Sequence, residues 1–485
     1  MTQENIKEHG LGFWGLTGIV FGSVIGGSIF NLAQTLARSA ALGPVLLAWL
    51  ITGLGVLFLV FTLKRLSDAR PDLKAGIYQY AQQGFGNYMG FNMAWGYWLC
   101  VILGNVTYGV MISDTLGAFL PAFRGGWMIF GFGTLLVWVM YGIVSRGIQS
   151  AASVNTALSV VKFLCILLIL GVLGLSVKIG MWSVDFWGHL SEGLGSVEHQ
   201  FSGCMLVTVW SFLGIEGAVM MSARARKPKD VGRATVTGYL LGLILYILVS
   251  LLCFGVMTQP QLAALPNPSL AYVLDATAGP WAKWLVIGSV LISLTGGFIS
   301  WTLVCAQVPY EAARVKIFPR RFLKLNNHGM PAFGMAAASV VMTLCLLLVV
   351  TAEDVYVAAL NLASLMVLPP YLFCGLYLWK IAGQKGRWPL LKGNVWLNRG
   401  IAALEIIYCL YVMWAATLQL LMVVSVFYLV GAGIYLIARR ENTARPIRLM
   451  PGIFTRWEFM LFMGITILAA LSVLLLMTGN IQLDV

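Results

Sequence analysis

Long stretches of this chain are apolar at nearly every position, with no polar face. Leu46–Phe61 and Phe163–Val177 are two examples. A helix that is apolar all round needs lipid or other helices around it. The strands of a membrane β-barrel would instead alternate polar and apolar residues. The pattern therefore predicts an all-α polytopic membrane protein.

The apolar segments predict thirteen membrane spans. Their expected ranges are 12–37, 42–63, 88–118, 127–144, 151–177, 199–222, 235–257, 282–312, 332–351, 355–379, 400–416, 418–438 and 457–478. Spans three and eight exceed the roughly 20 residues that cross a bilayer, which predicts that both are tilted. A very tight hairpin is expected between spans eleven and twelve.

An odd number of spans does not fit a bundle made only of two equal repeats. We expect residues 1–380 to form a transport core of ten spans, with repeats over about 12–177 and 199–380. Residues 381–485 would then add three peripheral spans.

Composition and charge support this prediction. Of the 485 residues, 59% are hydrophobic and 10% are charged, against roughly 25% charged in soluble proteins. A soluble enzyme, a disordered scaffold and a secreted disulfide-rich domain are therefore excluded. The net charge of +13 would suggest nucleic acid in a soluble protein. Here most basic residues fall in the segments that lie on one side of the membrane.

The distribution of these basic residues predicts the orientation. The basic segments follow spans two, six, eight, ten and twelve, and cytoplasmic loops are the ones enriched in Lys and Arg. We therefore expect a multi-pass protein of the bacterial inner membrane, with its N-terminus in the cytoplasm and its C-terminus outside. Its expected surroundings are the lipid bilayer, with no nucleic acid partner. No signal peptide is expected.

The sequence offers no constellation for catalysis, metal binding or a cofactor. The eight cysteines lie within apolar stretches without a CxxC spacing, and none of the four histidines is paired at ligand spacing. A Walker A motif is missing as well. We therefore expect no catalytic residues, no metal and no cofactor.

Two of the spans are interrupted by glycine. Gly22–Phe30 in span one holds three glycines within six residues, and Trp210–Gly217 in span six holds two glycines and Glu216. Transporters built from inverted repeats place such broken helices at matching positions, where half-helix ends bind substrate. An α-carboxylate suits the exposed N–H groups and an α-ammonium the freed carbonyls. The alternative is that these glycines serve close helix packing.

Glu216 is the most informative single residue. Asp114, Glu216, Glu311 and Glu405 are the acids that fall within predicted spans. Asp114 and Glu311 lie near helix ends, and Glu405 lies in a peripheral span, where a structural partner is expected. A carboxylate beside a helix break is costly unless it is solvated, paired or protonated. Glu216 is therefore a candidate for binding a cation or for coupling protonation to transport.

At this point the sequence resembles a known family. Gly22–Phe30 resembles the GSxxGxGIF signature of the amino acid–polyamine–organocation (APC) superfamily, and Trp210–Gly217 with Arg226–Thr235 resembles its sixth helix and following loop. Within the superfamily, further segments resemble the basic amino acid/polyamine antiporters, and specifically the bacterial arginine/ornithine antiporters. These segments are Pro71–Ala81, Gly84–Tyr88, Trp95–Cys100 and Gly104–Val106. Ser28 departs from the family pattern, which usually has glycine there.

The resemblance implies a five-plus-five inverted repeat with broken helices one and six, and a cationic amino acid bound between spans one, three, six, eight and ten. The implied substrate-binding residues are Ser23, Gly26, Gly27, Ser28, Cys100, Asn105, Tyr108, Trp210, Ser211, Glu216, Trp301 and Ser364. Trp210 would cover the substrate and Trp301 would stack on its cationic group. For Asn105 the alternative role is an interhelical hydrogen bond, and for Ser364 a cap on its local backbone.

The function that the resemblance implies is exchange of cationic amino acids by alternating access, with arginine and ornithine as the expected pair. A uniporter or proton symporter for a basic amino acid such as lysine stays open, as does exchange of an amino acid for its decarboxylation product. A transporter-like sensor is a remote alternative, and a homodimer is possible. A channel would be expected to line its path with polar or charged rings, which the sequence lacks.

Overall fold

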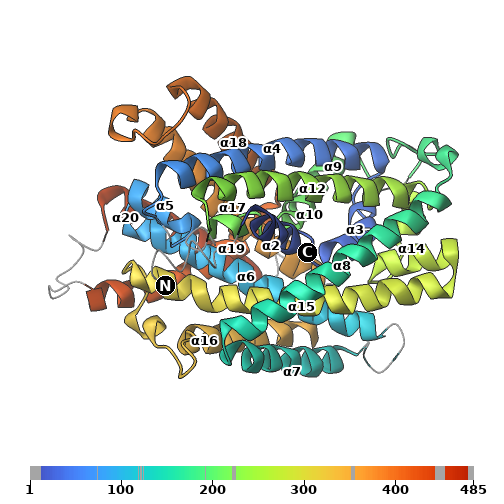
Figure 1. Ribbon diagram of the computed structural model, residues 1–485, viewed down its shortest axis with the longest axis horizontal. Helices are drawn as coiled ribbons and strands as arrows, with labels where there is room; N and C mark the ends of the chain where they lie inside the picture. Colours follow the sequence, from blue (N-terminus) through green and yellow to red (C-terminus); the bar gives the residue numbers. More distant parts are fainter. Residues whose placement is uncertain are drawn as a thin grey trace.

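The computed structural model describes residues 12–478, except for 74, 118–119, 121–122, 124, 192, 221–224, 351–354 and 443–453 (Figure 1). Apart from one isolated bridge between Leu325 and Pro331, the regular structure of this part is helical. The all-α polytopic fold class is confirmed.

The helices follow the expected spans closely. Their bounds are α2 Phe13–Val24, α3 Ser28–Ala37, α4 Leu42–Ala69, α5 Ile77–Phe85, α6 Asn87–Gly117, α7 Gly126–Ser145, α8 Ile148–Ser176, α9 Val197–Gly203, α10 Met205–Ser211, α11 Gly217–Met220, α12 Pro228–Phe254, α13 Gln259–Ala263, α14 Ser269–Ala278, α15 Pro280–Arg314, α16 Ala332–Leu347, α17 Val355–Ala382, α18 Val395–Ala415, α19 Leu418–Asn442 and α20 Arg456–Met477. Short 3₁₀ turns are η2 Ile179–Ser183, η4 Arg320–Leu323, η5 Leu348–Val350 and η6 Lys385–Arg387.

Length and composition support most of these helices as membrane spans. Among the described residues, nine helices are long and apolar enough to cross a membrane, and ten if the bent pair α2–α3 counts as one. Two shorter apolar helices, Val160–Ser176 and Ala332–Leu347, coincide with expected spans five and nine. Expected span six corresponds to the short helices α9, α10 and α11. The predicted orientation depends partly on the two termini. These lie outside the described part, at residues 1–11 and 479–485.

Both expected interruptions are present. α2 and α3 are separated by three residues and bent by 41°. α10 ends at Ser211 and α11 begins at Gly217, and Gly214 between them has a φ of +97°. That left-handed conformation strongly favours glycine. The glycines in these spans therefore mark real breaks in the helices.

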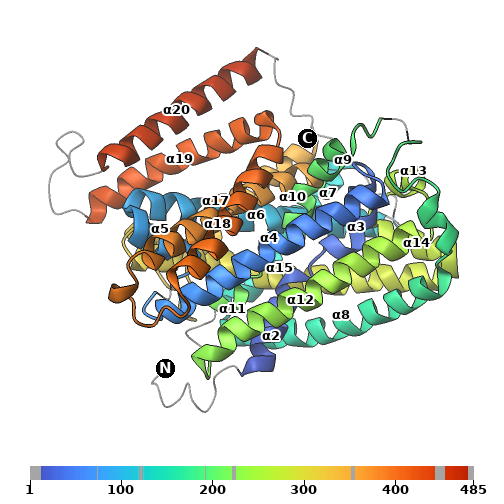
Figure 2. The ribbon, with the colours of Figure 1, turned by 90° about the horizontal axis from the view of Figure 1, so that it is seen from above.

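The broken helices lie among long continuous ones. α6 is the most enclosed of the candidate spans, with 89% of its apolar window buried, and it packs against α15 and α17. α4 and α12 lie side by side, and α19 and α20 form a pair at one edge of the bundle (Figure 2). The expected hairpin is also present, because only two residues separate α18 from α19. The short helices α5, α13 and α14 lie between spans and were not anticipated.

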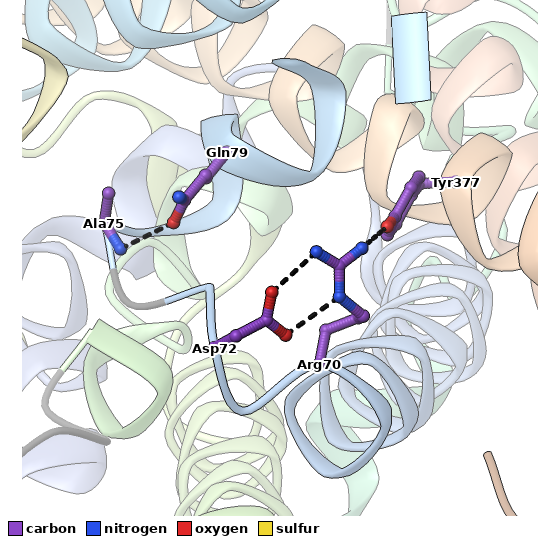
Figure 3. Close-up of polar contacts among 5 residues, drawn as sticks. All are labelled: Arg70, Asp72, Ala75, Gln79 and Tyr377. Carbon is purple, nitrogen blue, oxygen red and sulfur yellow. Dashed lines mark hydrogen bonds and ion pairs between the residues drawn. The ribbon is translucent and has the colours of Figure 1, made fainter. Parts of the chain in front are cut away.

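A polar cluster ties the loop after α4 to the end of α17 (Figure 3). Arg70 donates from Nε and Nη2 to the two carboxylate oxygens of Asp72, at 2.9 and 2.7 Å, and from Nη1 to the hydroxyl of Tyr377. The guanidinium also lies over the ring of Trp388, 4.6 Å from its centroid. The N–H of Ala75 donates to Gln79 Oε1 at 2.9 Å, which fixes the start of α5. One buried arginine thus joins three separate segments.

This cluster predicts a pH-dependent stability. The hydrogen bond from Arg70 lowers the pKa of Asp72. The contribution of this Arg70–Asp72 pair to the free energy of unfolding is therefore complete above the ordinary pKa of 3.8. It is lost as the pH falls through the lowered pKa of Asp72. Asp72→Asn should reduce the free energy of unfolding by about 1 kcal/mol or less at about pH 6, since the carboxylate is largely exposed.

Thermal unfolding of the detergent-solubilised protein checks this expectation. The difference between wild type and Asp72→Asn should shrink as the pH is lowered below about 4. The absence of any difference between the two proteins across this pH range would mean that Arg70 is held by Tyr377 and Trp388 alone.

Candidate functional site

The two helix breaks lie against each other. A Cβ atom on Gly214 would come within 2.7 Å of Ser23 Cβ, and one on Gly217 would lie 3.5 Å from Ser23 Oγ. Ser23 is therefore at the contact between the breaks, and its hydroxyl donates to Ile19 O at 2.7 Å within its own helix. The positive φ of Gly214 allows this approach. The second break thus packs against the last turn of α2, directly before the first break begins.

The beginning of α3 presents unpaired donors. The N–H groups of Gly27, Ser28 and Ile29 make no hydrogen bond with any other residue of the described chain. Three successive N–H groups at the start of a helix, together with the helix dipole, favour an anion. This end of the break can therefore accept a carboxylate.

The carbonyls at the end of α2 accept hydrogen bonds from the protein's own side chains, where a substrate α-ammonium was expected. Lys162 on α8 donates from Nζ to the carbonyls of Gly22, at 2.9 Å, and of Ile25. Tyr246 on α12 donates to the carbonyl of Val24 at 2.7 Å. An α-ammonium expected at the carbonyls of this break would have to compete with a buried lysine.

The second break retains free acceptors. The carbonyls of Ser211 and Leu213 accept no backbone or side-chain hydrogen bond from the residues described here. Backbone oxygens exposed by unwinding are suitable acceptors for an ammonium group. The cationic end of an amino acid backbone therefore fits span six better than span one.

Four predicted site residues meet around span three. A Cβ on Gly104 of α6 would lie 3.2 Å from the indole of Trp210 and 3.5 Å from that of Trp301. One turn further, Tyr108 packs edge-on against Trp301 with ring centroids 6.5 Å apart. The Tyr108 hydroxyl reaches the first break, 2.9 Å from the position of a Cβ on Gly26. The structure therefore joins Gly26, Tyr108, Trp210 and Trp301 into one aromatic cluster, and Gly104 makes room for both indoles.

Glu216 is fully buried and is held by two tyrosines. Tyr371 of α17 donates to Glu216 Oε2 at 2.8 Å, and Tyr97 of α6 donates to Oε1. A buried carboxylate needs such donors, because its desolvation is otherwise very costly. These two hydrogen bonds link spans three, six and ten through the side chain of Glu216.

Sequence reasoning missed both tyrosines. Tyr97 lies three residues before Cys100, a spacing that places both on one face of α6, and Tyr371 directly follows Pro369 and Pro370. Lys162 was missed as well, because nothing in the sequence indicates that its side chain contacts the first break.

The remaining predicted residues lie nearby in less direct roles. Ser28 Oγ is 2.8 Å from the hydroxyl of Tyr246, so the side chain that glycine would lack points toward α12. A Cβ on Gly27 would overlap Leu294 of α15, which explains glycine at this position. Ser211 and Ser364 are fully buried and donate to Val207 O and Leu360 O, at 3.0 and 2.8 Å, within their own helices.

Asn105 and Cys100 lie on the buried face of α6. The Asn105 amide donates to Cys305 Sγ at 3.5 Å, whereas its Oδ1 has no partner among the described residues. A fully buried acceptor without a donor is available to a ligand. Cys100 is also fully buried, one turn before Gly104. As for metals, the described residues contain no group of three or more His, Cys, Asp or Glu side chains that could hold an ion.

Comparison with known proteins accounts for this architecture. Residues 11–417 match the amino acid permease family model. The chain is 38% identical to an arginine/agmatine antiporter of Chlamydia pneumoniae and 37% identical to an arginine/ornithine antiporter of Pseudomonas aeruginosa, with both chains covered completely in each case. It is also 39% identical to an arginine/agmatine antiporter of Chlamydia trachomatis serovar L2, over 97% of both chains. The broken helices, the buried aromatic cluster and these full-length similarities together show that the chain belongs to the amino acid permeases of the APC superfamily, which are transporters and not enzymes.

Proposed function

We propose that this protein exchanges cationic amino acids across the bacterial inner membrane, with arginine and ornithine as the preferred pair. The observation that carries the proposal is the set of unpaired N–H groups at Gly27, Ser28 and Ile29 beside the aromatic cluster. The arginine/ornithine and arginine/agmatine antiporters to which the chain is similar support a basic substrate. The proposal places the substrate between the two breaks.

The two ends of the site suit the two ends of such a substrate. Its carboxylate binds the N–H groups at the start of α3, and its α-ammonium binds the carbonyls of Ser211 and Leu213. Its cationic side chain extends between the indoles of Trp210 and Trp301. A guanidinium stacked on an indole gains about 0.5–2 kcal/mol. Asn105 Oδ1, which is buried and unpaired, supplies a further acceptor.

The carboxylate-binding end distinguishes the candidate exchange partners. Ornithine keeps the α-carboxylate of an amino acid, whereas agmatine, the decarboxylation product of arginine, lacks it. An agmatine-loaded site would leave the N–H groups of α3 without an anion. This favours ornithine as the second substrate, and the arginine/agmatine pair is the competing candidate.

We further propose that the end of the bundle with the basic loops faces the cytoplasm, and that the C-terminus lies outside. The loops after α4 and α15, together with the start of α12, carry clusters of Lys and Arg, as cytoplasmic segments do. We also propose that ten spans form the transport core and that three further spans are peripheral. A homodimer is a further proposal.

Counterflow in proteoliposomes tests the exchange. Vesicles loaded with ornithine, loaded with agmatine or left empty receive labelled arginine outside. Uptake should be fastest with ornithine inside, slower with agmatine, and near background in empty vesicles. Equal uptake by empty and loaded vesicles would establish a uniporter, and uptake that requires an imposed proton gradient would establish a symporter.

Trp210 should matter for transport and not for folding. Trp210→Leu removes one of the two rings that converge at Gly104, so arginine exchange should fall by about 2- to 30-fold, which corresponds to one cation–π contact. The protein level in the membrane should be unchanged. Trp414→Leu is the matched control, because Trp414 is 67% exposed on α18. If the two variants transport equally well, Trp210 serves packing only.

Glu216 should set the preference for a positive charge. Glu216→Gln keeps the shape and removes the charge, and the amide nitrogen replaces one of the two oxygens that accept from Tyr97 and Tyr371. Arginine and ornithine exchange should fall about tenfold or more, as expected for the loss of a charge-assisted contact, and discrimination against neutral citrulline should shrink. The pH dependence of exchange should also flatten.

Glu405→Gln is the control for this variant, since Glu405 is a fully buried carboxylate on the peripheral helix α18. Wild-type rates, pH profile and selectivity in Glu216→Gln would show that selectivity arises from aromatic stacking alone.

A further inference from the structure

A pocket lies at the end of the bundle that carries the basic loops, away from the helix breaks. It has a volume of about 470 Å³ and lies between the beginning of α2, the end of α4 and the first turns of α12. Figure 2 shows these three helix ends on the same side of the molecule. Phe13 and Phe61 form its apolar wall, whereas Lys64, Asp230, Arg233 and Thr237 form its polar wall. This arrangement suits an amphipathic ligand.

The pocket lies at the level where the apolar parts of the helices end, which is the expected boundary between lipid and water. On α4 the apolar run ends at Leu63, and Lys64 and Arg65 follow directly. α2 begins at Phe13, and the next residue, Trp14, is 76% exposed. Aromatic residues and the ends of apolar runs are typical of the headgroup region. A phospholipid headgroup is the ligand that the membrane itself supplies at this level.

The two cations of the pocket are available for such a headgroup. Neither Lys64 nor Arg233 forms an ion pair with any other described residue. The stem of Lys64 lies directly on Gly232 of α12, where a Cβ atom would overlap it. This contact fixes the direction of the amine without neutralising it. A glycine at this position therefore allows a lysine of α4 to approach an arginine of α12.

We propose that this pocket binds the headgroup of an anionic phospholipid of the phosphatidylglycerol type. The phosphodiester accepts hydrogen bonds from Lys64 and Arg233, which bridges α4 and α12. The glycerol hydroxyls donate to Asp230, which would otherwise repel an anion. One headgroup charge thus balances the pocket's two cations and one carboxylate. Basic pockets between helices at this level are suited to anionic lipids.

The proposed lipid also contacts the broken span. Phe13 is the first residue of α2, and α2 packs along α12. A lipid held between α4 and α12 therefore stabilises the position of the first half of the broken helix. This inference concerns a site separate from the transported substrate and does not depend on the substrate pair.

Thermal unfolding of the purified full-length protein in neutral detergent tests the site. Phosphatidylglycerol, phosphatidylethanolamine and soluble glycerol 3-phosphate are each titrated into lipid-depleted protein. Phosphatidylglycerol should raise the midpoint by about 2–4 °C, in the range expected for modest ligand stabilisation. The other two should have little effect. An equal shift with phosphatidylethanolamine would overturn the selection by charge, and an equal shift with glycerol 3-phosphate would mean a phosphate site without a lipid.

Two variants locate the effect. The double variant Lys64→Met with Arg233→Gln should lose the shift. A control that removes the same charge elsewhere, Arg321→Gln with Lys392→Met, should keep it. Persistence of the shift in the pocket variant, or its loss in both variants, would overturn the proposal.

Asp230→Asn supplies a test in the opposite direction, which remains informative if the double variant does not fold. Removing the carboxylate leaves two cations facing the phosphate. The phosphatidylglycerol concentration at half-maximal shift should therefore fall severalfold. The asparagine side chain keeps one acceptor oxygen for the glycerol hydroxyls, so an unchanged or increased concentration would place the lipid outside this pocket.

Discussion

An interrupted helix in an apolar interior exposes peptide groups that need polar partners, and the arrangement of this protein follows from how they are satisfied. Unsatisfied backbone groups away from water each cost several kcal/mol in a lipid environment. At the first break the carbonyls accept from Lys162 and Tyr246, whereas the first N–H groups of α3 have no partner within the described part of the chain. Break one therefore has one end satisfied by the protein and one end available to a ligand.

The same requirement explains why distant helices converge on the breaks. Glu216 needs donors, and they come from α6 and α17 through Tyr97 and Tyr371. A single acid thus fixes the relative positions of spans three, six and ten. Helix α20 is tied to α6 in a similar way. Glu458 at the start of α20 accepts from the N–H of Tyr88 at 3.0 Å and from that of Thr455 at 2.8 Å. One carboxylate therefore caps two helices that are far apart in the sequence.

The sequence predicts those features that depend on local chemistry. Continuous apolar runs located the spans, and glycines located both breaks, because glycine destabilises a helix wherever it occurs. The conformation of Gly214 and the bend after Val24 confirm those positions. The depth and isolation of Glu216 also singled it out as a buried carboxylate. Each of these signals can be read within a single segment of the chain, without knowledge of its neighbours in space.

The unpredicted features depend on contacts between segments. Lys162 and Gly22 are 140 residues apart, and helical periodicity gives the face of a side chain but not its partner. For Glu405, a structural partner was expected, and its carboxylate faces Thr62 of α4 and the backbone of Gly375, although no described residue makes a hydrogen bond of close geometry with it. The carboxylate lies against Gly375 of α17, 2.8 Å from the position of a Cβ. The small helices α5, α13 and α14 escaped prediction because they are too short for a clear apolar period.

The unpaired N–H groups also bear on why such a carrier would exchange substrates and not move them one way. If alternating access closes the site around its contents, an empty site closes around three donors without an anion. Each buried unsatisfied donor costs about 1–3 kcal/mol, and every 1.4 kcal/mol slows a step about tenfold. Water that enters the empty site offsets part of this cost, but it supplies no negative charge opposite the positive end of the helix dipole. Return of the empty carrier is then slow relative to return with a second carboxylate-bearing substrate, so the proposed antiport follows from the same backbone geometry that binds the amino acid.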